Sequence, residues 1–197
     1  MTDKRTALAL LLAAVVWVAV ACNVIAPSAD LFDRQFIDMM VPHHQGAVEM
    51  AKLAQQRGEH AEIKEMAGAV IRAQEDEIGK MRTWRKARYD SEQTPAMSQM
   101  PMVPGMAGHG GHGTTMDMAA DVEKLRSAPA PFDRALIDAM IPHHESAIEA
   151  AKAVETRAQK PEIRDLARAI IADQQREIDA MKRWRQSWYG STGTSGQ

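Results

Sequence analysis

Met-Val-Pro-His-His at Met40–His44 returns one hundred residues later as Met-Ile-Pro-His-His at Met140–His144. The repetition extends well beyond these pentapeptides. The segments Phe32–Tyr89 and Phe132–Tyr189 align around them without a gap, and nearly half of the aligned residues are identical. The chain therefore consists largely of two copies of one unit, and the structure of that unit decides the fold.

Each copy has the apolar periodicity of two helices. In the first copy, one helix is predicted to begin at Leu31 with Asp30 as its N-cap, and to end at Gly58. The other is predicted to run from about Ala61 to Arg88. The apolar stripe of the first helix contains Phe32, Phe36, Met39, Met40, His43, Ala47, Met50 and Ala54.

The pentapeptide places its two histidines differently on this helix. His43 is predicted near the centre of the apolar face and His44 at its edge. The second helix of each copy carries a glutamine and a glutamate on its own apolar face. Since buried polar side chains need partners, we expect these residues to orient the imidazoles, with a plain polar network in the core as the alternative. They are Gln74, Glu77, Gln174 and Glu177.

Two helical hairpins that each carry one apolar face can bury those faces against each other. The sequence therefore predicts an all-α fold, a four-helix bundle made of two repeated hairpins. The first hairpin occupies residues 30–90, and residues 116–190 hold a short helix, Met116–Arg126, followed by the second hairpin. The alternative is two separate hairpins that each pair with another chain, which the linker at 91–115 permits.

Four prolines bear on the helices. Pro42 and Pro142 fall inside the helical pattern, where proline removes a backbone hydrogen bond and predicts a kink. Pro131 and Pro161 suit the first turns of the two later helices.

Residues 1–21 have the form of an export signal. Lys4 and Arg5 precede an uninterrupted apolar run at 7–21, which is short for a membrane-spanning helix. The protein is therefore expected in the periplasm or elsewhere in the cell envelope. Cys22, the only cysteine, is a candidate for lipid attachment and hence for a membrane anchor. Cleavage that leaves a free thiol and an uncleaved anchor are the alternatives.

The overall charge bears on the class of partner. The 197 residues carry a formal net charge of −2, and no long run of Lys or Arg is present. A nucleic-acid partner requires a basic stripe, so none is expected. Composition leaves the oligomeric state open.

Methionine and histidine together make each pentapeptide a candidate metal site. Imidazole and thioether favour copper, and thioether favours Cu(I), with Cu(II) as the alternative. A methionine stripe that only fills the core is the other reading. Because Ala150 replaces Met50 in the second copy, the stronger site is expected in the first. The predicted ligands on the helices are Met40, His43, His44, Met50, Met81, Met140, His143, His144 and Met181.

The linker is a second candidate for binding soft metal ions. Proline and glycine around its methionines disfavour a helical core, so core packing does not account for them. The predicted ligands are Met97, Met100, Met102, Met106, His109, His112, Met116 and Met118. His60 differs, because the second copy has Lys160 there, and we expect a surface residue at an interhelical turn.

These motifs resemble a known family. Met-x-Pro-His-His is followed by Ala47–Lys52 and Ala147–Lys152, and later by a Gln-x2-Glu-Ile-x2-Met-x2-Trp pattern at Gln74–Trp84 and Gln174–Trp184. The chain is similar to domain of unknown function 305, a ferritin-like group of exported bacterial proteins that includes periplasmic copper-binding and copper-resistance members. The resemblance implies a four-helix bundle and copper bound through methionine and histidine. The ligands that it implies are Met40, His43, His44, Met81, Met140, His143, His144 and Met181.

The expected function is an extracytoplasmic copper-binding protein, without enzymatic activity, that buffers, sequesters or transfers the ion. A copper exporter or another periplasmic copper protein is the expected partner. One alternative is a structural or interaction lipoprotein without a metal function. A ferritin-like di-metal oxidase is less favoured, since the paired Glu-x-x-His motifs of such centres are missing from the sequence.

Overall fold

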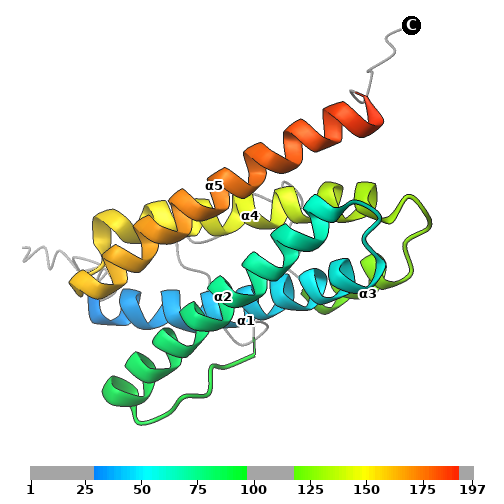
Figure 1. The fold of residues 1–197 in the computed structure, drawn as a ribbon. Helices are drawn as coiled ribbons and strands as arrows, with labels where there is room; N and C mark the ends of the chain where they lie inside the picture. The colour runs from blue at the N-terminus through cyan, green and yellow to red at the C-terminus, as the bar shows by residue number, and fades with distance from the viewer. Residues whose placement is uncertain (1–28, 97–117, 191–197) are drawn as a thin grey trace, which may run out of the picture.

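A computed structural model describes residues 29–96 and 118–190 of the chain (Figure 1). The described residues form helices and their connections, so the predicted all-α fold is confirmed. The helices are α1 (Ala29–Arg57), α2 (Ala61–Tyr89), α3 (Met118–Arg126), α4 (Phe132–Arg157) and α5 (Pro161–Tyr189).

Helices α1 and α4 pack against each other in the middle of a four-helix bundle (Figure 1). Helix α2 folds back along α1, helix α5 folds back along α4, and the short α3 lies against both α1 and α4. The two hairpins thus pair within one chain, as the bundle prediction requires. Because α1 is covered by α2, α3 and α4, most of its residues from Phe32 to Ala54 are buried.

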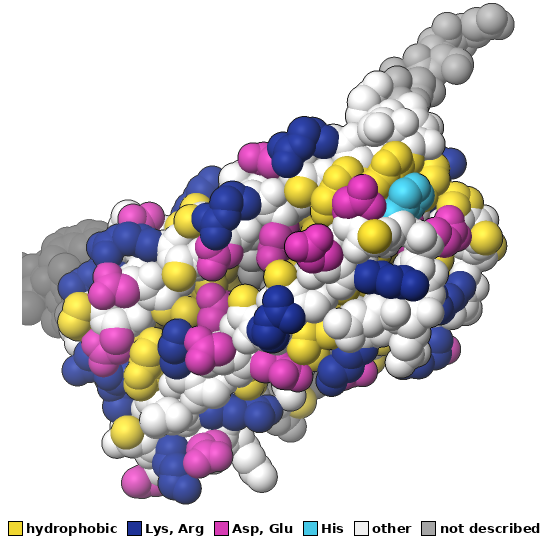
Figure 2. All heavy atoms as spheres, in the orientation of Figure 1, with side chains coloured by type: hydrophobic (Ala, Val, Ile, Leu, Met, Phe, Trp, Pro, Cys, Tyr) yellow, Lys and Arg dark blue, Asp and Glu magenta, His cyan; other side chains and the backbone are white. Residues whose placement is uncertain are grey.

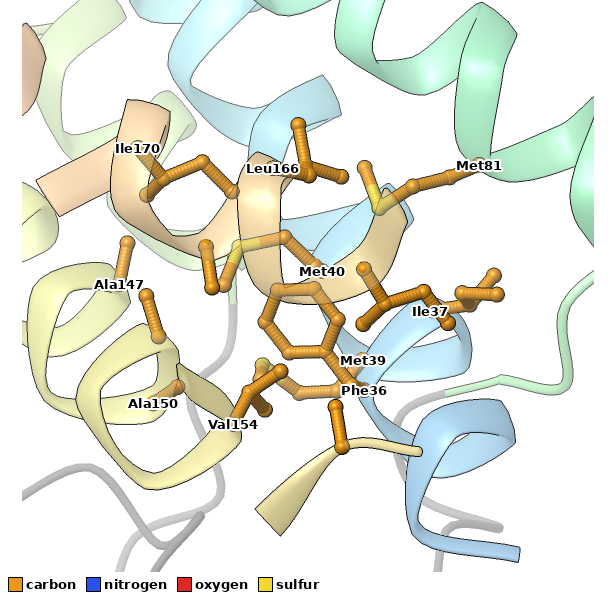
Figure 3. Packing of buried hydrophobic residues seen from close by; sticks show 14 of the residues in the cluster. Phe36, Ile37, Met39, Met40, Met81, Ala147, Ala150, Val154, Leu166 and Ile170 are labelled. Carbon is orange, nitrogen blue, oxygen red and sulfur yellow. The ribbon is translucent and has the colours of Figure 1, made fainter. Parts of the chain in front are cut away.

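The core consists of two apolar clusters. Figure 3 shows the first cluster, in which Met40 from α1 and Met81 from α2 lie among Phe36, Leu166 and Ile170. The second cluster is built mainly of residues from the opposite halves of the same helices. It includes Met50, Ile63, Met66, Leu136, Met140, Ile178 and Met181. Each cluster therefore combines side chains from both repeats.

The prolines are accommodated without breaking a helix. Helix α1 continues past Pro42, and α4 continues past Pro142. Pro161 opens α5 at its first turn, as predicted. Pro131 lies one residue earlier than predicted, as the N-cap of α4.

The interhelical turns are held by aspartates from the opposite hairpin. The two carboxylate oxygens of Asp133 accept hydrogen bonds from the backbone N–H groups of Glu59 (2.9 Å) and His60 (2.8 Å) at the α1–α2 turn. Asp33 does the same for Gln159 and Lys160 at the α4–α5 turn, both at 3.1 Å. Both aspartates are fully buried. Each hairpin therefore supplies the hydrogen-bond acceptors for the backbone N–H groups at the other hairpin's interhelical turn.

Helix α3 is fixed at its C-terminal end. Arg57 donates hydrogen bonds to the carbonyls of Leu125, Arg126 and Ala128, where the last helical carbonyls have no partner within the helix. The side chain of Leu125 is buried in the second cluster. The docking of α3 through Leu125 and Arg57 thereby sets the position of Met118, the first residue of the helix.

The outer face of the bundle is polar and mixed in charge. On the side shown in Figure 2, Lys and Arg side chains are interspersed with Asp and Glu side chains, without a continuous basic stripe. Among the described helices, none has the length and apolar character needed to cross a bilayer.

Candidate metal centre

The two pentapeptides meet where α1 and α4 pack together. The rings of His43 and His143 stack with their centroids 3.9 Å apart and their planes inclined by 30°. His44 and His144 lie beside them, with centroid distances of 6.3 and 6.2 Å to the preceding histidine of the same helix. The sequence predicted one site in each copy, whereas the structure brings all four imidazoles into one group, which we call the histidine centre.

The outer histidines are held by carboxylates from the neighbouring helices. His44 Nε2 lies 2.7 Å from Glu77 Oε2 of α2, and His144 Nε2 lies 2.7 Å from Glu177 Oε2 of α5. The predicted pairing of imidazoles with these glutamates is therefore present. His44, predicted at the edge of the apolar face, is nevertheless fully buried. Three helices cover α1, so the edge of its apolar face is still inside the bundle.

The inner histidines are held by Ser146 and by a backbone carbonyl. His143 Nε2 lies 3.2 Å from the carbonyl oxygen of His43, which can only accept, so Nε2 of His143 carries the hydrogen. The Ser146 hydroxyl donates to the His143 carbonyl (2.7 Å) and therefore accepts from His43 Nε2 (2.9 Å). The hydrogen-bond partners assign both rings as Nε2–H tautomers.

The same assignment holds for the outer pair, because an ionised carboxylate only accepts hydrogen bonds. In the neutral form of each ring, the lone pair is then on Nδ1. The Nδ1 atoms of His43, His44 and His144 are buried and have no hydrogen-bond partner. These three nitrogens are therefore unused donors to a metal ion in the interior of the bundle.

Burial keeps the inner histidines uncharged. It lowers the pKa of His43 well below its ordinary value, and repulsion from His143, His44 and His144 lowers it further. Burial, with smaller contributions from His144 and His44, lowers the pKa of His143 to about 3. Both rings are thus neutral at neutral pH and keep the lone pair that a metal requires.

The predicted methionine ligands divide between the two apolar clusters. Met40 and Met81 belong to the first cluster, as expected for one site. Met50, however, belongs to the second cluster with Met140 and Met181. Its assignment to the first copy's site is wrong, because the antiparallel pairing of α1 and α4 places the second half of α1 beside the first half of α4. The larger methionine set thus lies in the cluster that contains Met140 of the second copy's pentapeptide.

The glutamines that recur in the two copies differ from the glutamates, because their side-chain oxygens do not contact an imidazole through a hydrogen bond. Gln74 and Gln174 are buried, and the Oε1 atom of each has no hydrogen-bond partner. These amide oxygens are further unused acceptors in the core. Their predicted role in orienting the imidazoles stays a prediction.

Nitrogen and oxygen ligands alone do not assemble a site in the described part of the chain. Within residues 29–96 and 118–190, no three His, Cys, Asp or Glu side chains are grouped to hold one ion. The described donors are instead single imidazole nitrogens and the thioethers of the two apolar clusters. Such a donor set suits a soft ion with few ligands better than a hard divalent ion.

Several predicted sites lie outside the described residues. These are the export signal at 1–21, Cys22, and the linker ligands Met97, Met100, Met102, Met106, His109, His112 and Met116. Met118 is described, and its side chain lies against Gly46 of α1 together with the ring of His143.

Three structural roles were missed by sequence reasoning. Ser146 was not singled out, although the change from Gly46 to Ser146 beside identical histidine pairs was a visible signal. Asp133 was noted only as part of the repeat. His60 was predicted as a plain surface residue, yet its Nδ1 lies 2.7 Å from Asp133 and its ring stacks on Trp188 at 3.7 Å.

Known structures share this architecture. CopM in its Cu(II)-bound form is 42% identical, with 80% of this chain and 97% of that chain covered and a TM-score of 0.66. CopM in its Cu(I)-bound form is 38% identical, with 80% and 98% covered and a TM-score of 0.65. A DUF305 protein from Streptomyces coelicolor, thought to be secreted, is 25% identical, with 82% and 96% covered and a TM-score of 0.67.

Sequence comparison places the chain in the same group. No curated protein matches it. The model of the family described as Domain of unknown function (DUF305) matches residues 33–192, which include all four helices of the bundle except the first few residues of α1. The chain belongs to the DUF305 family.

Proposed function

We propose that this protein binds copper ions outside the cytoplasm and buffers, sequesters or transfers them through histidine and methionine ligands. The proposal depends on the three buried Nδ1 atoms of His43, His44 and His144 that lack a hydrogen-bond partner. A buried acceptor left unpaired costs about 1–3 kcal/mol. An ion bound at one of these nitrogens would supply the partner that this nitrogen lacks.

The surroundings of the histidine centre favour Cu(I). Thioethers of Met40 and Met81 lie in the apolar cluster on one side, and those of Met50, Met140 and Met181 lie in the cluster on the other. Thioether and imidazole suit Cu(I), and a monovalent ion is less costly to bury than a divalent one. Cu(II) is the alternative, and both forms of copper occur in the similar CopM structures.

The glutamates complete the proposed site without touching the ion. Glu77 and Glu177 hold His44 and His144 in the Nε2–H tautomer and direct Nδ1 toward the interior. Each carboxylate also places a negative charge near a bound cation. We therefore assign the glutamates an orienting role and the imidazoles the binding role.

The protein is proposed to act as a carrier or store and not as an enzyme. Export is supported by the signal-like residues 1–21 and by the related Streptomyces protein that is thought to be secreted. A lipid on Cys22 would hold the protein at a membrane. A copper exporter or another periplasmic copper protein would receive the ion.

Competition with a chromophoric Cu(I) chelator under anaerobic conditions tests the proposal. The informative variant replaces His43, His44, His143 and His144 together by Gln, because the amide N–H of Gln can replace Nε2–H while the Nδ1 lone pair is lost. The wild type is expected to withdraw Cu(I) from the chelator, and the variant to lose its tightest sites. His60→Asn, outside the histidine centre, is the matched control and should bind as the wild type does.

Thermal unfolding separates copper binding from a purely structural role. A ligand that binds only the folded state must raise the melting temperature. We expect Cu(I) and Ag(I) to raise it in the wild type and to raise it less in the Gln variant. A wild type that neither competes for Cu(I) nor gains stability would favour the structural bundle instead.

A further inference from the structure

The two repeats differ in one residue beside the stacked histidines. Position 46 is glycine and position 146 is serine. Ser146 fills its side of the stack, since its hydroxyl bonds both His43 Nε2 and the carbonyl of His143. Gly46 has no side chain to fill the corresponding side. The histidine centre is therefore closed by a hydroxyl on one side only.

Met118 packs closely against the space that a side chain at position 46 would enter. A Cβ atom on Gly46 would lie 3.3 Å from both Cβ and Sδ of Met118, and 3.5 Å from Cε1 of His143. The thioether and the imidazole thus lie against the same face of the glycine. Cε1 lies between the two ring nitrogens, and Nε2 is already engaged with the carbonyl of His43, so Nδ1 is the nitrogen left for a ligand. A thioether and an imidazole therefore both border the space beside this glycine.

The docking of α3 fixes Met118 in this place. The helix is held by the buried Leu125 and by the three hydrogen bonds from Arg57 to its C-terminal carbonyls. Met118 is its first residue and is half-buried. The methionine consequently reaches the histidine centre from an element that belongs to neither hairpin.

The two stacked histidines also differ in their exposed fraction. His143, on the Met118 side, is 7% exposed, whereas His43, on the Ser146 side, is 1% exposed. His143 is therefore the less deeply buried ring of the stacked pair. The buried methionines of the two apolar clusters lie deeper, at 0–1% exposure for Met40, Met50, Met81, Met140 and Met181.

We infer that Met118 and His143 form an entry site for a soft monovalent ion, Cu(I) or Ag(I), with Met118 Sδ and His143 Nδ1 as its ligands. Gly46 keeps this site accessible to the thioether, and Ser146 closes the equivalent place in the other repeat. The inference rests on the proposed function, because it identifies where the same centre is loaded. Thioether and imidazole are ligands that a soft ion accepts with few others.

The test is an NMR titration of the full chain, labelled with ¹³C at the methionine methyl groups, with Ag(I) at less than one equivalent. The methyl signal of Met118 and the Cε1–H signal of His143 are expected to shift at the first additions. Met118→Leu assigns the methyl signal and should abolish the early shift of His143. Gly46→Ser should abolish both early shifts, because its side chain displaces Met118. Gly79→Ser, the same change at a glycine where an added side chain would meet nothing, should keep them.

The outcomes separate this inference from the proposed function. Early shifts elsewhere with none at Met118, or unchanged early shifts in folded Gly46→Ser, would refute the entry site and leave copper binding intact. No response to Ag(I) anywhere in the wild type would refute both. If Gly46→Ser does not fold, Met118→Leu decides the question, since an early shift of His143 in that variant contradicts the inference.

Discussion

His43 and His143 stack ring on ring at the crossing of α1 and α4, although one hundred residues separate them in the chain. They occupy equivalent positions in the two repeats. The histidine centre therefore lies where the two repeated halves of the protein meet. Burial at this crossing has made both rings weak bases. Their position therefore links the stability of the bundle to pH.

Acidification should lower the free energy of unfolding already between pH 7 and pH 5, which is above the pH range in which carboxylates titrate. Below the ordinary pKa of 6.5, the unfolded chain protonates these histidines, whereas folded His143 stays neutral until about pH 3. The unfolded state then binds more protons, so the free energy of unfolding falls as pH falls, by about 1.4 kcal/mol per pH unit for each histidine. Urea unfolding at pH 7, 6 and 5 measures this slope. The His43→Gln/His143→Gln double variant should show a shallower slope, and an unchanged slope would contradict the assignment.

Removing the charge of Glu77 should weaken both folding and copper binding. Glu77→Gln replaces a carboxylate that accepts a 2.7 Å hydrogen bond from buried His44. A hydrogen bond to a charged group contributes about 1.5–3 kcal/mol, and partners that orient metal ligands contribute about 10–100-fold in affinity. Urea unfolding and Cu(I) competition measure the two effects. Glu75→Gln, on the exposed face of the same helix, should change neither.

The crossed aspartates should be strong determinants of stability. Asp33→Asn and Asp133→Asn each keep one of two acceptor oxygens and leave a half-buried backbone N–H less well paired, at an expected cost of about 1–3 kcal/mol. Asp133→Asn should cost more, because Asp133 also holds His60. Asp76→Asn, in an exposed pair with Lys80, should stay within about 0.5 kcal/mol of the wild type. Equal stability of all three variants would rule out the capping role.

Met50 should report on the second apolar cluster and not on the first. Met50→Leu removes a thioether while conserving volume, so its cost in stability should be below about 1.5 kcal/mol. In an Ag(I) titration followed by methionine methyl signals, the variant should alter the responses of Met140 and Met181. The responses of Met40 and Met81 should be those of the wild type. The reverse pattern would restore the grouping that the sequence alone indicated.

Helical periodicity and repetition made most of the fold predictable. The helices and the hairpins follow from local pattern, and a glutamate on an apolar stripe required a partner such as His44. Whether the hairpins pair within one chain or with another chain was left open by that pattern. The burial and the contacts of residues between the hairpins depend on how the hairpins dock, and they were not predictable from local pattern. The helical wheel treats α1 as having one buried face, so it could not anticipate that α2, α3 and α4 together would bury His44 as well.

The grouping of the site residues also depended on docking. No periodicity within one repeat shows that Met50 packs with Met140, or that His43 meets His143. The difference between Gly46 and Ser146 was visible in the alignment of the copies, but its meaning required the position of α3. Sequence comparison of repeats identifies where they differ, and only the tertiary arrangement shows which neighbour uses the difference.

The exchange of aspartates between the hairpins has a consequence for the symmetry of the protein. Asp33 caps the turn of the second hairpin and Asp133 caps the turn of the first, so neither hairpin completes its own turn. A chain with a single hairpin would have to obtain that cap from a second copy of itself, in a symmetric homodimer whose two His43 rings stack on each other. The present chain holds the same arrangement within one polypeptide. Its two halves can therefore differ, with glycine at position 46 and serine at position 146, whereas a symmetric dimer would carry the same residue on both sides.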